Sequence, residues 1–149
     1  MRIVLVEPEI PQNTGSIARV AAATRTPLDL IKPLGFSLAD KYLKRAGLDY
    51  WPHVDLTVWD SWEAYSAVEH VGALVAFSAR ATQKYTERTY GGDERLVFGK
   101  ETKGLDARVL DVAAGDVWTI PIDNPAVRSL NLSNSVSIVL YEARRQVGV

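Results

Sequence analysis

The sequence contains no cysteine, and this absence excludes two kinds of site. Without thiols, the chain of 149 residues can form neither disulfides nor zinc–thiolate centres. Histidine is scarce as well. His53 and His70 stand apart from each other in the sequence, and each is expected to be a structural or surface residue rather than a metal ligand. We therefore expect no metal in this protein.

An excess of charge of one sign and a long apolar run are missing too. The formal net charge is −1 and the pI is near 6.1, so contact with nucleic acid would need a local basic patch. No apolar run approaches the ~20 residues of a membrane span, and Glu7 and Pro8 follow the first apolar run too early for a signal peptide. The expected location is the cytoplasm, with no membrane partner.

The hydrophobic content, 47%, is enough for one compact domain over residues 1–149. Short apolar runs alternate with segments of helical periodicity. The expected strands are 2–6, 28–32, 54–59, 72–78, 96–98 and 117–120, and the expected helices are 16–24, 38–45, 60–69, 106–113 and 132–143. This alternation predicts an α/β fold, with a parallel sheet and helices on both faces.

A turn-forming segment follows the first expected strand. Pro11, Asn13 and Gly15 are typical of a turn, and Asn13 or Thr14 is the expected N-cap of the next helix. Arg19 then lies about one turn into that helix, where the helix dipole disfavours a cation. The side chain of Arg19 therefore either points to solvent or faces an anion.

Small polar residues gather where the last expected strand gives way to the C-terminal helix. Residues 128–134 are Arg-Ser-Leu-Asn-Leu-Ser-Asn, and helical periodicity begins at Leu132. Because capping needs only one or two such side chains, this run favours a polar ligand at the start of the helix. An over-capped surface helix is the alternative.

Two glycines flank Glu101 after the expected strand 96–98. Leu105 and Asp106 stand where a P-loop has Lys and Ser or Thr, and no G-x-G-x-x-G follows a strand, so neither nucleotide-binding signature is present. Gly99 and Gly104 instead permit close approach of the backbone to a flat ligand. Gly104→Val is expected to weaken ligand binding, through crowding or through loss of a positive φ.

Two other segments carry basic and aromatic side chains together. Residues 40–51 include Lys41, Lys44 and Arg45 beside tyrosine and tryptophan, a composition suited to phosphate contact and base stacking, although an ordinary solvated face has it as well. Residues 80–92 are polar. They form either a mobile loop or part of an RNA surface.

Three of these segments together resemble the motifs of the SPOUT superfamily of RNA methyltransferases. Residues 7–19 are similar to its first motif, residues 98–105 (Phe-Gly-x-Glu-x-x-Gly-Leu) to its second and residues 128–143 to its third. The motifs span nearly the whole chain in the family's order. Residues 44–50 (Lys-Arg-Ala-Gly-Leu-Asp-Tyr) further resemble a subgroup of small SPOUT proteins that methylate tRNA at the wobble position.

The resemblance implies the SPOUT fold, in which a C-terminal trefoil knot is made by passing the last helix through segments near 78–90 and 99–105. It also implies S-adenosylmethionine as cofactor, and methylation of the ribose 2′-hydroxyl of the wobble nucleotide, position 34, a cytidine or modified uridine. A homodimer is expected, because one small protomer offers limited surface to a tRNA. Ile17, Val20, Val139 and Tyr141 either supply its interface or belong to the core.

By the same resemblance, the catalytic residues are Arg19, Asn13, Ser129 and Asn131. We expect Arg19 to bind phosphate and stabilise a developing alkoxide rather than to act as a base, because a guanidinium pKa lies above ~12. The implied cofactor-binding residues are Phe77, Ser78, Gly99, Glu101, Gly104, Ile120, Ile122, Ser129 and Leu130, and the implied RNA-binding residues are Lys41, Lys44, Arg45, Arg128 and Tyr141.

Other functions remain open at this stage. The chain could methylate another tRNA or rRNA site, serve as a knotted RNA-binding or scaffolding protein without turnover, or bind a small molecule with flavodoxin-like topology. Only the methyltransferase hypothesis requires S-adenosylmethionine, so calorimetry with that cofactor separates it from the others.

Overall fold

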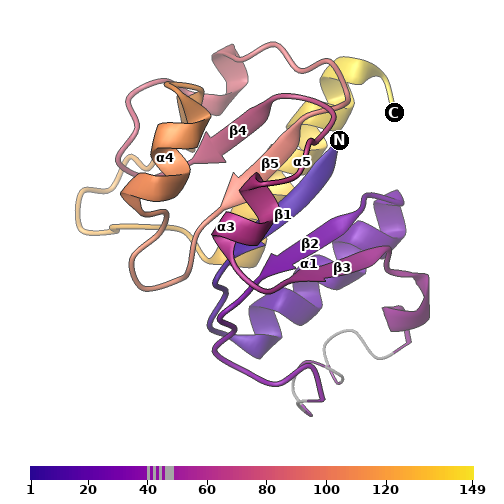
Figure 1. The fold of residues 1–149 in the computed structure, drawn as a ribbon. Helices are drawn as coiled ribbons and strands as arrows, with labels where there is room; N and C mark the ends of the chain where they lie inside the picture. Colours follow the sequence, from indigo (N-terminus) through magenta and orange to yellow (C-terminus); the bar gives the residue numbers. More distant parts are fainter. Residues whose placement is uncertain (40, 42, 44, 46–48) are drawn as a thin grey trace.

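The computed structural model describes residues 1–39, 41, 43, 45 and 49–149, and its centre is a six-stranded sheet (Figure 1). The strands are β1 (Arg2–Val6), β2 (Leu28–Ile31), β3 (Leu56–Trp59), β4 (Leu74–Phe77), β5 (Arg95–Phe98) and β6 (Val117–Trp118). They lie in the order β3-β2-β1-β5-β4-β6, and every neighbouring pair is parallel. The predicted parallel sheet is confirmed.

Helices cover both faces of this sheet, as predicted. They are α1 (Pro11–Thr24), α3 (Trp62–Ser66), α4 (Ala107–Ala113) and α5 (Leu132–Val147), with the short 3-10 helices η1 (Trp51–His53) and η2 (Tyr85–Glu87). Within β1, Ile3 and Leu5 pack with α1 and α5, whereas Val4 and Val6 pack with α3 and α4. Side chains alternate between the faces along a strand, so the continuous apolar run of β1 serves two cores.

Two helices begin elsewhere than the sequence predicted. Helix α1 begins at Pro11, so Asn13 and Thr14 lie within its first turn and neither is its N-cap. Proline suits this position because the first helical N–H needs no partner inside the helix. Helix α3 begins at Trp62 and not at residue 60, and it is capped by Ser61, whose Oγ accepts from the Ala64 N–H at 3.1 Å.

Other expected segments differ in length or lie outside the description. Helix α3 ends at Ser66 and not near Glu69. Strand β6 stops at Trp118, two residues earlier than expected, while α5 continues past Ala143 to Val147. The predicted helix 38–45 includes residues outside the described ones, and Lys44 is among them.

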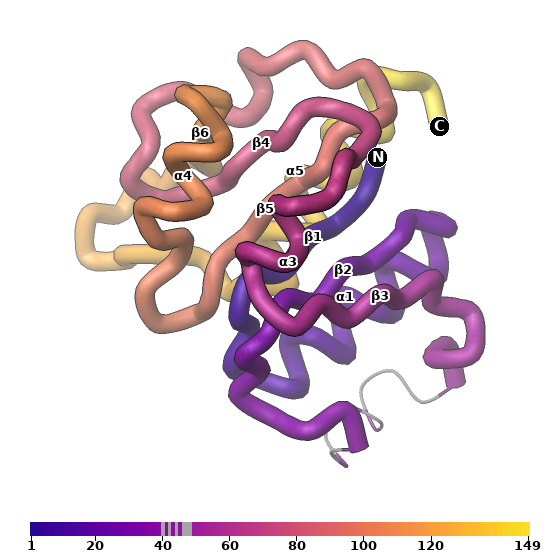
Figure 2. The backbone as a smooth tube through the Cα atoms, in the orientation of Figure 1, coloured from indigo at the N-terminus to yellow at the C-terminus, as the bar shows by residue number. Residues whose placement is uncertain are grey.

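The last part of the chain returns from the edge of the sheet to its middle. After β6, which pairs with β4, residues 119–131 lead to α5, and α5 packs on the α1 side of the sheet (Figure 2). This path brings the turns that follow β1, β5 and β6 to one edge of the sheet. None of the helices within the described residues is long and apolar enough to cross a membrane.

Candidate functional site

A cavity of about 830 Å³ lies at the carboxyl ends of β4 and β5. Ligands of open α/β sheets bind at this end of the strands, and the volume is in the usual range for small-molecule sites. Every predicted cofactor-binding residue lines this cavity, and so do three of the predicted catalytic residues and one predicted RNA-binding residue. These are Asn13, Phe77, Ser78, Gly99, Glu101, Gly104, Ile120, Ile122, Arg128, Ser129, Leu130 and Asn131.

The remaining predicted residues lie elsewhere. Arg19 is exposed on α1, outside the cavity lining, and its guanidinium lies over the ring of Tyr50, 4.9 Å from the ring centroid. Lys41 and Arg45 are exposed and do not line the cavity, and Tyr141 is 55% exposed on α5. A single chain therefore does not bring Arg19 to the cavity.

Glu101 holds the start of α1. Its Oε2 accepts from the Glu9 N–H at 2.7 Å, and its Oε1 accepts from the Ile10 N–H at 3.1 Å and from Asn13 Nδ2 at 3.2 Å. The N-cap residue of α1, Ile10, has no side-chain acceptor to offer. A carboxylate from the second motif therefore supplies the acceptor and the negative charge that a helix N-terminus favours.

A second amide continues this network to the third motif. The carboxylate of Glu101 can only accept, so the Asn13 amide nitrogen must face it and the Asn13 Oδ1 must face the other way. That oxygen accepts from Asn131 Nδ2 at 2.9 Å. Asn131 Oδ1 in turn accepts from the N–H groups of Ser133 and Asn134, at 2.9 and 3.3 Å, and so caps α5.

These contacts form a relay, Glu101–Asn13–Asn131, that joins the three motifs beside the cavity. Asn13 is only 7% exposed, so its amide is held away from competing water. The relay occupies both ends of the Asn13 amide. Its geometry indicates that Asn13 positions the site.

Two more acidic residues join the turn after β1 to the turn after β5. The Glu9 carboxylate accepts from the N–H of Thr102 at 3.0 Å and from its Oγ1 at 2.9 Å. Glu7 pairs with Lys100 at 2.6 Å, and its carboxylate raises the pKa of Lys100. The sequence analysis assigned no role to Glu7 or Glu9, although two acidic residues just after the end of a strand could have indicated one.

The glycine turn needs its two glycines for different reasons. A Cβ on Gly99 would lie 2.1 Å from the carbonyl carbon of Gly104, far inside any contact distance. Gly104 has φ of +69° and nothing within 4 Å of its Cβ position. The expected positive φ at Gly104 is present, and no protein atom crowds its Cβ position, so crowding of a bound ligand there stays a prediction. In this turn the crowded position is Gly99.

The walls of the cavity suit a flat, partly apolar ligand. The rings of Phe77 and Phe98 stack with their centroids 4.9 Å apart at its base. Ile120 and Leu130 add apolar surface, and Ser129 adds a hydroxyl. Such a mixture, with backbone from the glycine turn, fits an adenosine moiety and its polar tail.

Further cavity residues escaped the sequence analysis. They are Ile10, Arg80, Lys100, Thr102 and Lys103, among others. Lys100 and Lys103 sit on either side of Glu101 in the glycine turn, which was a usable signal. For Arg80, the sequence offered no signal beyond its position in a polar segment.

The polar segment 80–92 is packed onto the rest of the protein. Arg88 donates to both oxygens of Asp116 at 2.9 Å and to Glu94 at 3.2 Å, and its side chain is 12% exposed. Gln146 on α5 accepts from the Tyr90 N–H at 3.0 Å. Arg88 therefore holds this segment in place and is not offered to a ligand.

Comparisons with known proteins agree with one another. Residues 1–141 match the SpoU rRNA Methylase family. The chain is 46% identical over 147 residues to a tRNA (cytidine(34)-2′-O)-methyltransferase of Saccharophagus degradans, covering 98% of this chain and 95% of the relative. It is 44% identical over 149 residues to the protein of the same name from Escherichia coli K12, covering 99% and 94%.

Solved structures extend this similarity to the fold. One structure, described as giving structural insights into the 2-OH methylation of C/U34 on tRNA, matches with a TM-score of 0.91 and 47% identity, over 99% of this chain and 95% of the other. The SpoU methyltransferase AviRb from Streptomyces viridochromogenes, in complex with the cofactor AdoMet, shares the fold with a TM-score of 0.85 at 24% identity, over 98% of this chain and 60% of the other.

Proposed function

The chain belongs to the SpoU rRNA Methylase family, and we propose that it methylates the ribose 2′-hydroxyl of the wobble nucleotide, position 34, of tRNA with S-adenosylmethionine as methyl donor. The observation that carries this proposal is the cavity at the three motif turns, which the predicted cofactor-binding residues line together. Relatives that align over nearly the whole chain are tRNA 2′-O-methyltransferases.

The cavity residues fit S-adenosylmethionine, which when bound supplies an electrophilic methyl group on a sulfonium. The walls from Phe77, Ile120 and Leu130 would hold the adenosine, and the close backbone packing at Gly99 keeps the adjoining turn in shape. These residues exclude water and fix the orientation of the cofactor. A weak nucleophile such as a ribose hydroxyl depends on that alignment.

The chain must also stabilise the charge that develops on the ribose oxygen. We assign this to Arg19, whose guanidinium offers a fixed cation and a donor fork. Ser129 lines the cavity, and we assign it a position beside the reacting centre. Asn131 and Asn13 hold the loops through the relay, so their contribution is to position Ser129 and the turn around it.

Arg19 can reach a reacting centre only if a second chain completes the site, because in its own chain it lies outside the cavity lining. This favours the homodimer. Of the residues considered for its interface, Ile17 and Val139 are fully buried and belong to the core. Exposed apolar side chains on the outer face of α5 remain, Ile138 at 37% and Tyr141 at 55%. Sedimentation should show a dimer that Tyr141→Asp weakens.

The trefoil knot is also part of this proposal. It is supported by the return of the chain from edge strand β6 to α5 in the middle of the molecule (Figure 2). A fully extended chain spans about 3.3–3.6 Å for each of its 149 residues. When the two termini are pulled apart, the unfolded protein should measure less than this, because a tightened knot keeps some residues out of the extended length. We place the enzyme in the cytoplasm because tRNA is there.

The function is tested by mapping methylated nucleotides. tRNA from a deletion strain, incubated with purified protein and S-adenosylmethionine, should gain one methyl group on the ribose of nucleotide 34, as seen by mass spectrometry of nuclease fragments. Methylation at a different nucleotide would show that the enzyme acts on another site of the RNA. Tight RNA binding with no methyl transfer would leave only the RNA-binding alternative.

A further inference from the structure

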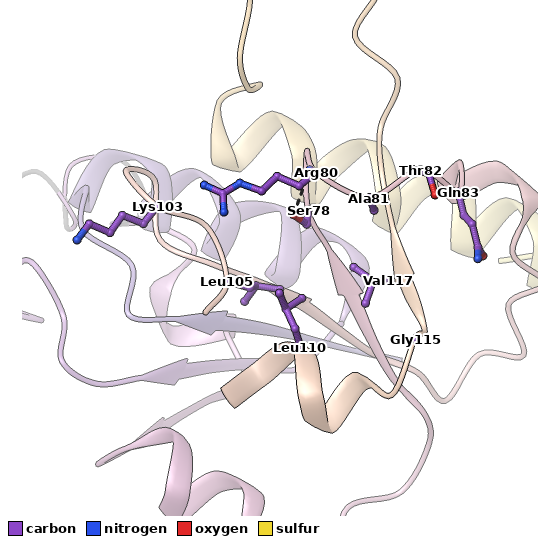
Figure 3. Close-up of a pocket in the computed structure, with 10 residues that line it drawn as sticks. All are labelled: Ser78, Arg80, Ala81, Thr82, Gln83, Lys103, Leu105, Leu110, Gly115 and Val117. Carbon is purple, nitrogen blue, oxygen red and sulfur yellow. Dashed lines mark hydrogen bonds between the residues drawn. The ribbon is translucent and has the colours of Figure 1, made fainter. Parts of the chain in front are cut away.

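A second cavity, of about 350 Å³, adjoins the cofactor cavity (Figure 3). We name it the Leu110 pocket. Its lining is Ser78, Arg80, Ala81, Thr82, Gln83, Lys103, Leu105, Leu110, Gly115 and Val117. Three residues line both cavities: Ser78, Arg80 and Lys103. A ligand in one cavity therefore lies next to the rim of the other cavity.

The Leu110 pocket has an apolar floor and a cationic rim. Leu105, Leu110 and Val117 form the floor, between the start of α4 and the edge strand β6. Arg80 and Lys103 are exposed at the rim, and in Figure 3 the Arg80 side chain extends toward the turn that bears Lys103. The lining includes two cations and no carboxylate. The rim is therefore suited to an anion.

The rim cations differ from their basic neighbours. Lys100 and Arg108 are neutralised by Glu7, and Arg108 also pairs with Glu63 and Asp106. No carboxylate in the described part of the chain lies within salt-bridge distance of Arg80 or Lys103. Two cations at the rim of one opening, in a chain of net charge −1, form the local basic patch that RNA contact requires.

We propose that the Leu110 pocket binds a nucleotide of the substrate RNA that flanks the methylated one, with its base over the apolar floor and its phosphate between Arg80 and Lys103. The inference rests on the proposed function, because the methylated ribose must lie at the cofactor cavity and its neighbours must then lie at the shared rim. Single-stranded RNA is commonly recognised through splayed bases held against apolar or guanidinium surfaces.

The methionyl end of S-adenosylmethionine is a less suitable occupant. That cofactor carries a sulfonium and an ammonium against one carboxylate, so it is a net cation. The lining of the Leu110 pocket offers no carboxylate to these two positive groups, whereas the lining of the cofactor cavity includes Glu101. The two cations of the Leu110 pocket attract a phosphodiester. The charge of the lining thus favours RNA.

The first experiment removes the rim charge. Arg80→Gln/Lys103→Gln should raise the dissociation constant for tRNA by about tenfold or more and lower the slope of log K against log salt by about 0.7–0.9, the value for one lost phosphate contact. The dissociation constant for S-adenosylmethionine, from calorimetry on the same variant, should change less than that for tRNA, although both residues also line the cofactor cavity. Arg25→Gln is the matched control, because Arg25 is exposed at the far end of α1.

The second experiment fills the pocket. Ala81→Leu adds side-chain volume to the lining without removing core atoms. With wild-type protein, an anticodon stem-loop that is abasic at nucleotide 33 or 35 should bind more weakly than the intact stem-loop. With Ala81→Leu, the intact and abasic RNAs should bind alike, because the pocket no longer accepts the base.

Three results decide the matter. Unchanged tRNA affinity in Arg80→Gln/Lys103→Gln, with wild-type methylation at nucleotide 34, overturns the inference and leaves the proposed function intact. A larger loss of S-adenosylmethionine affinity than of tRNA affinity assigns the rim to the cofactor and also overturns the inference. Absence of tRNA methylation by the wild-type protein counts against the proposed function itself.

Discussion

Arg19 is the residue on which the proposed chemistry depends most. It is exposed on α1 and stacks over Tyr50, away from the residues that line the cofactor cavity. Arg19→Ala should therefore leave S-adenosylmethionine affinity unchanged while lowering turnover by about 100-fold or more, the scale of losing one positioned donor in the transition state. Single-turnover kinetics with saturating tRNA measure this, with Arg25→Gln as the control on the same helix.

Arg19→Lys refines the test. Lysine keeps the charge and loses the planar fork, so substantial recovery of the rate would assign the effect to charge alone. A wild-type rate in Arg19→Ala at saturating substrate would show that Arg19 is an ordinary surface residue.

Gly99 and Gly104 should respond differently to alanine. In Gly99→Ala, the new Cβ would lie 2.1 Å from the carbonyl carbon of Gly104, so the Gly104 backbone must move. We therefore expect a lower melting temperature and at least tenfold weaker S-adenosylmethionine binding. Gly104→Ala meets no neighbour within 4 Å and should cost only the positive φ, about 1–2 kcal/mol. Calorimetry and thermal unfolding of both variants check this. Equal effects would contradict the assignment of the close contact to Gly99.

At the scale of elements, the start of α1 depends on Glu101 from a distant turn. Glu101→Ala leaves three donors without their acceptor, at Glu9, Ile10 and Asn13, so unfolding in urea should show a loss of about 1–3 kcal/mol. Glu101→Gln retains one oxygen and should lose less. Glu69→Ala, which removes an exposed acid, is the control and should stay within about 0.5 kcal/mol of wild type.

A loss no larger than that of the control would mean that α1 is held without Glu101. The relay has a further consequence, because Glu101 holds the same Asn13 amide that accepts from Asn131. We therefore expect Glu101→Ala to reduce turnover as well as stability.

At the scale of the whole molecule, the network around Arg88 links segment 80–92, β6 and α5 and makes stability depend on pH. Burial disfavours the charged form of Asp116, but hydrogen bonds from Arg88 and from the Trp118 indole outweigh it, and the pKa of Asp116 is lowered. Burial likewise opposes ionisation of Glu94, yet the N–H groups of Gly91 and Gly92 and the charge of Arg88 lower its pKa.

A carboxyl group with a lowered pKa in the folded state stabilises the fold above its unfolded pKa, near 4, and loses that contribution as pH falls through the folded value. The free energy of unfolding should thus decrease from about pH 5 to pH 3. In Arg88→Met the decrease should be smaller, because both folded pKa values rise. Urea titrations at each pH measure this, with Lys84→Met as control. An identical pH dependence in Arg88→Met would remove Arg88 as the cause.

The sequence by itself determined the strands, the α/β class and the glycine turn. Each of these depends on periodicity or on contacts a few residues apart, which local sequence specifies. The motif pattern also determined the family and those predicted residues that line the cavity, because the motifs match in order along nearly the whole chain.

Only the tertiary structure decided what those residues do for one another. The acceptor that caps α1 comes from Glu101, about ninety residues away, so local chemistry pointed instead to Asn13 or Thr14. Arg80 and Arg88 are alike in sequence, but one lines two cavities and the other is enclosed by Asp116 and Glu94. Which donor meets which acceptor depends on how the strands are ordered and how the chain returns to α5, and no local pattern encodes that path.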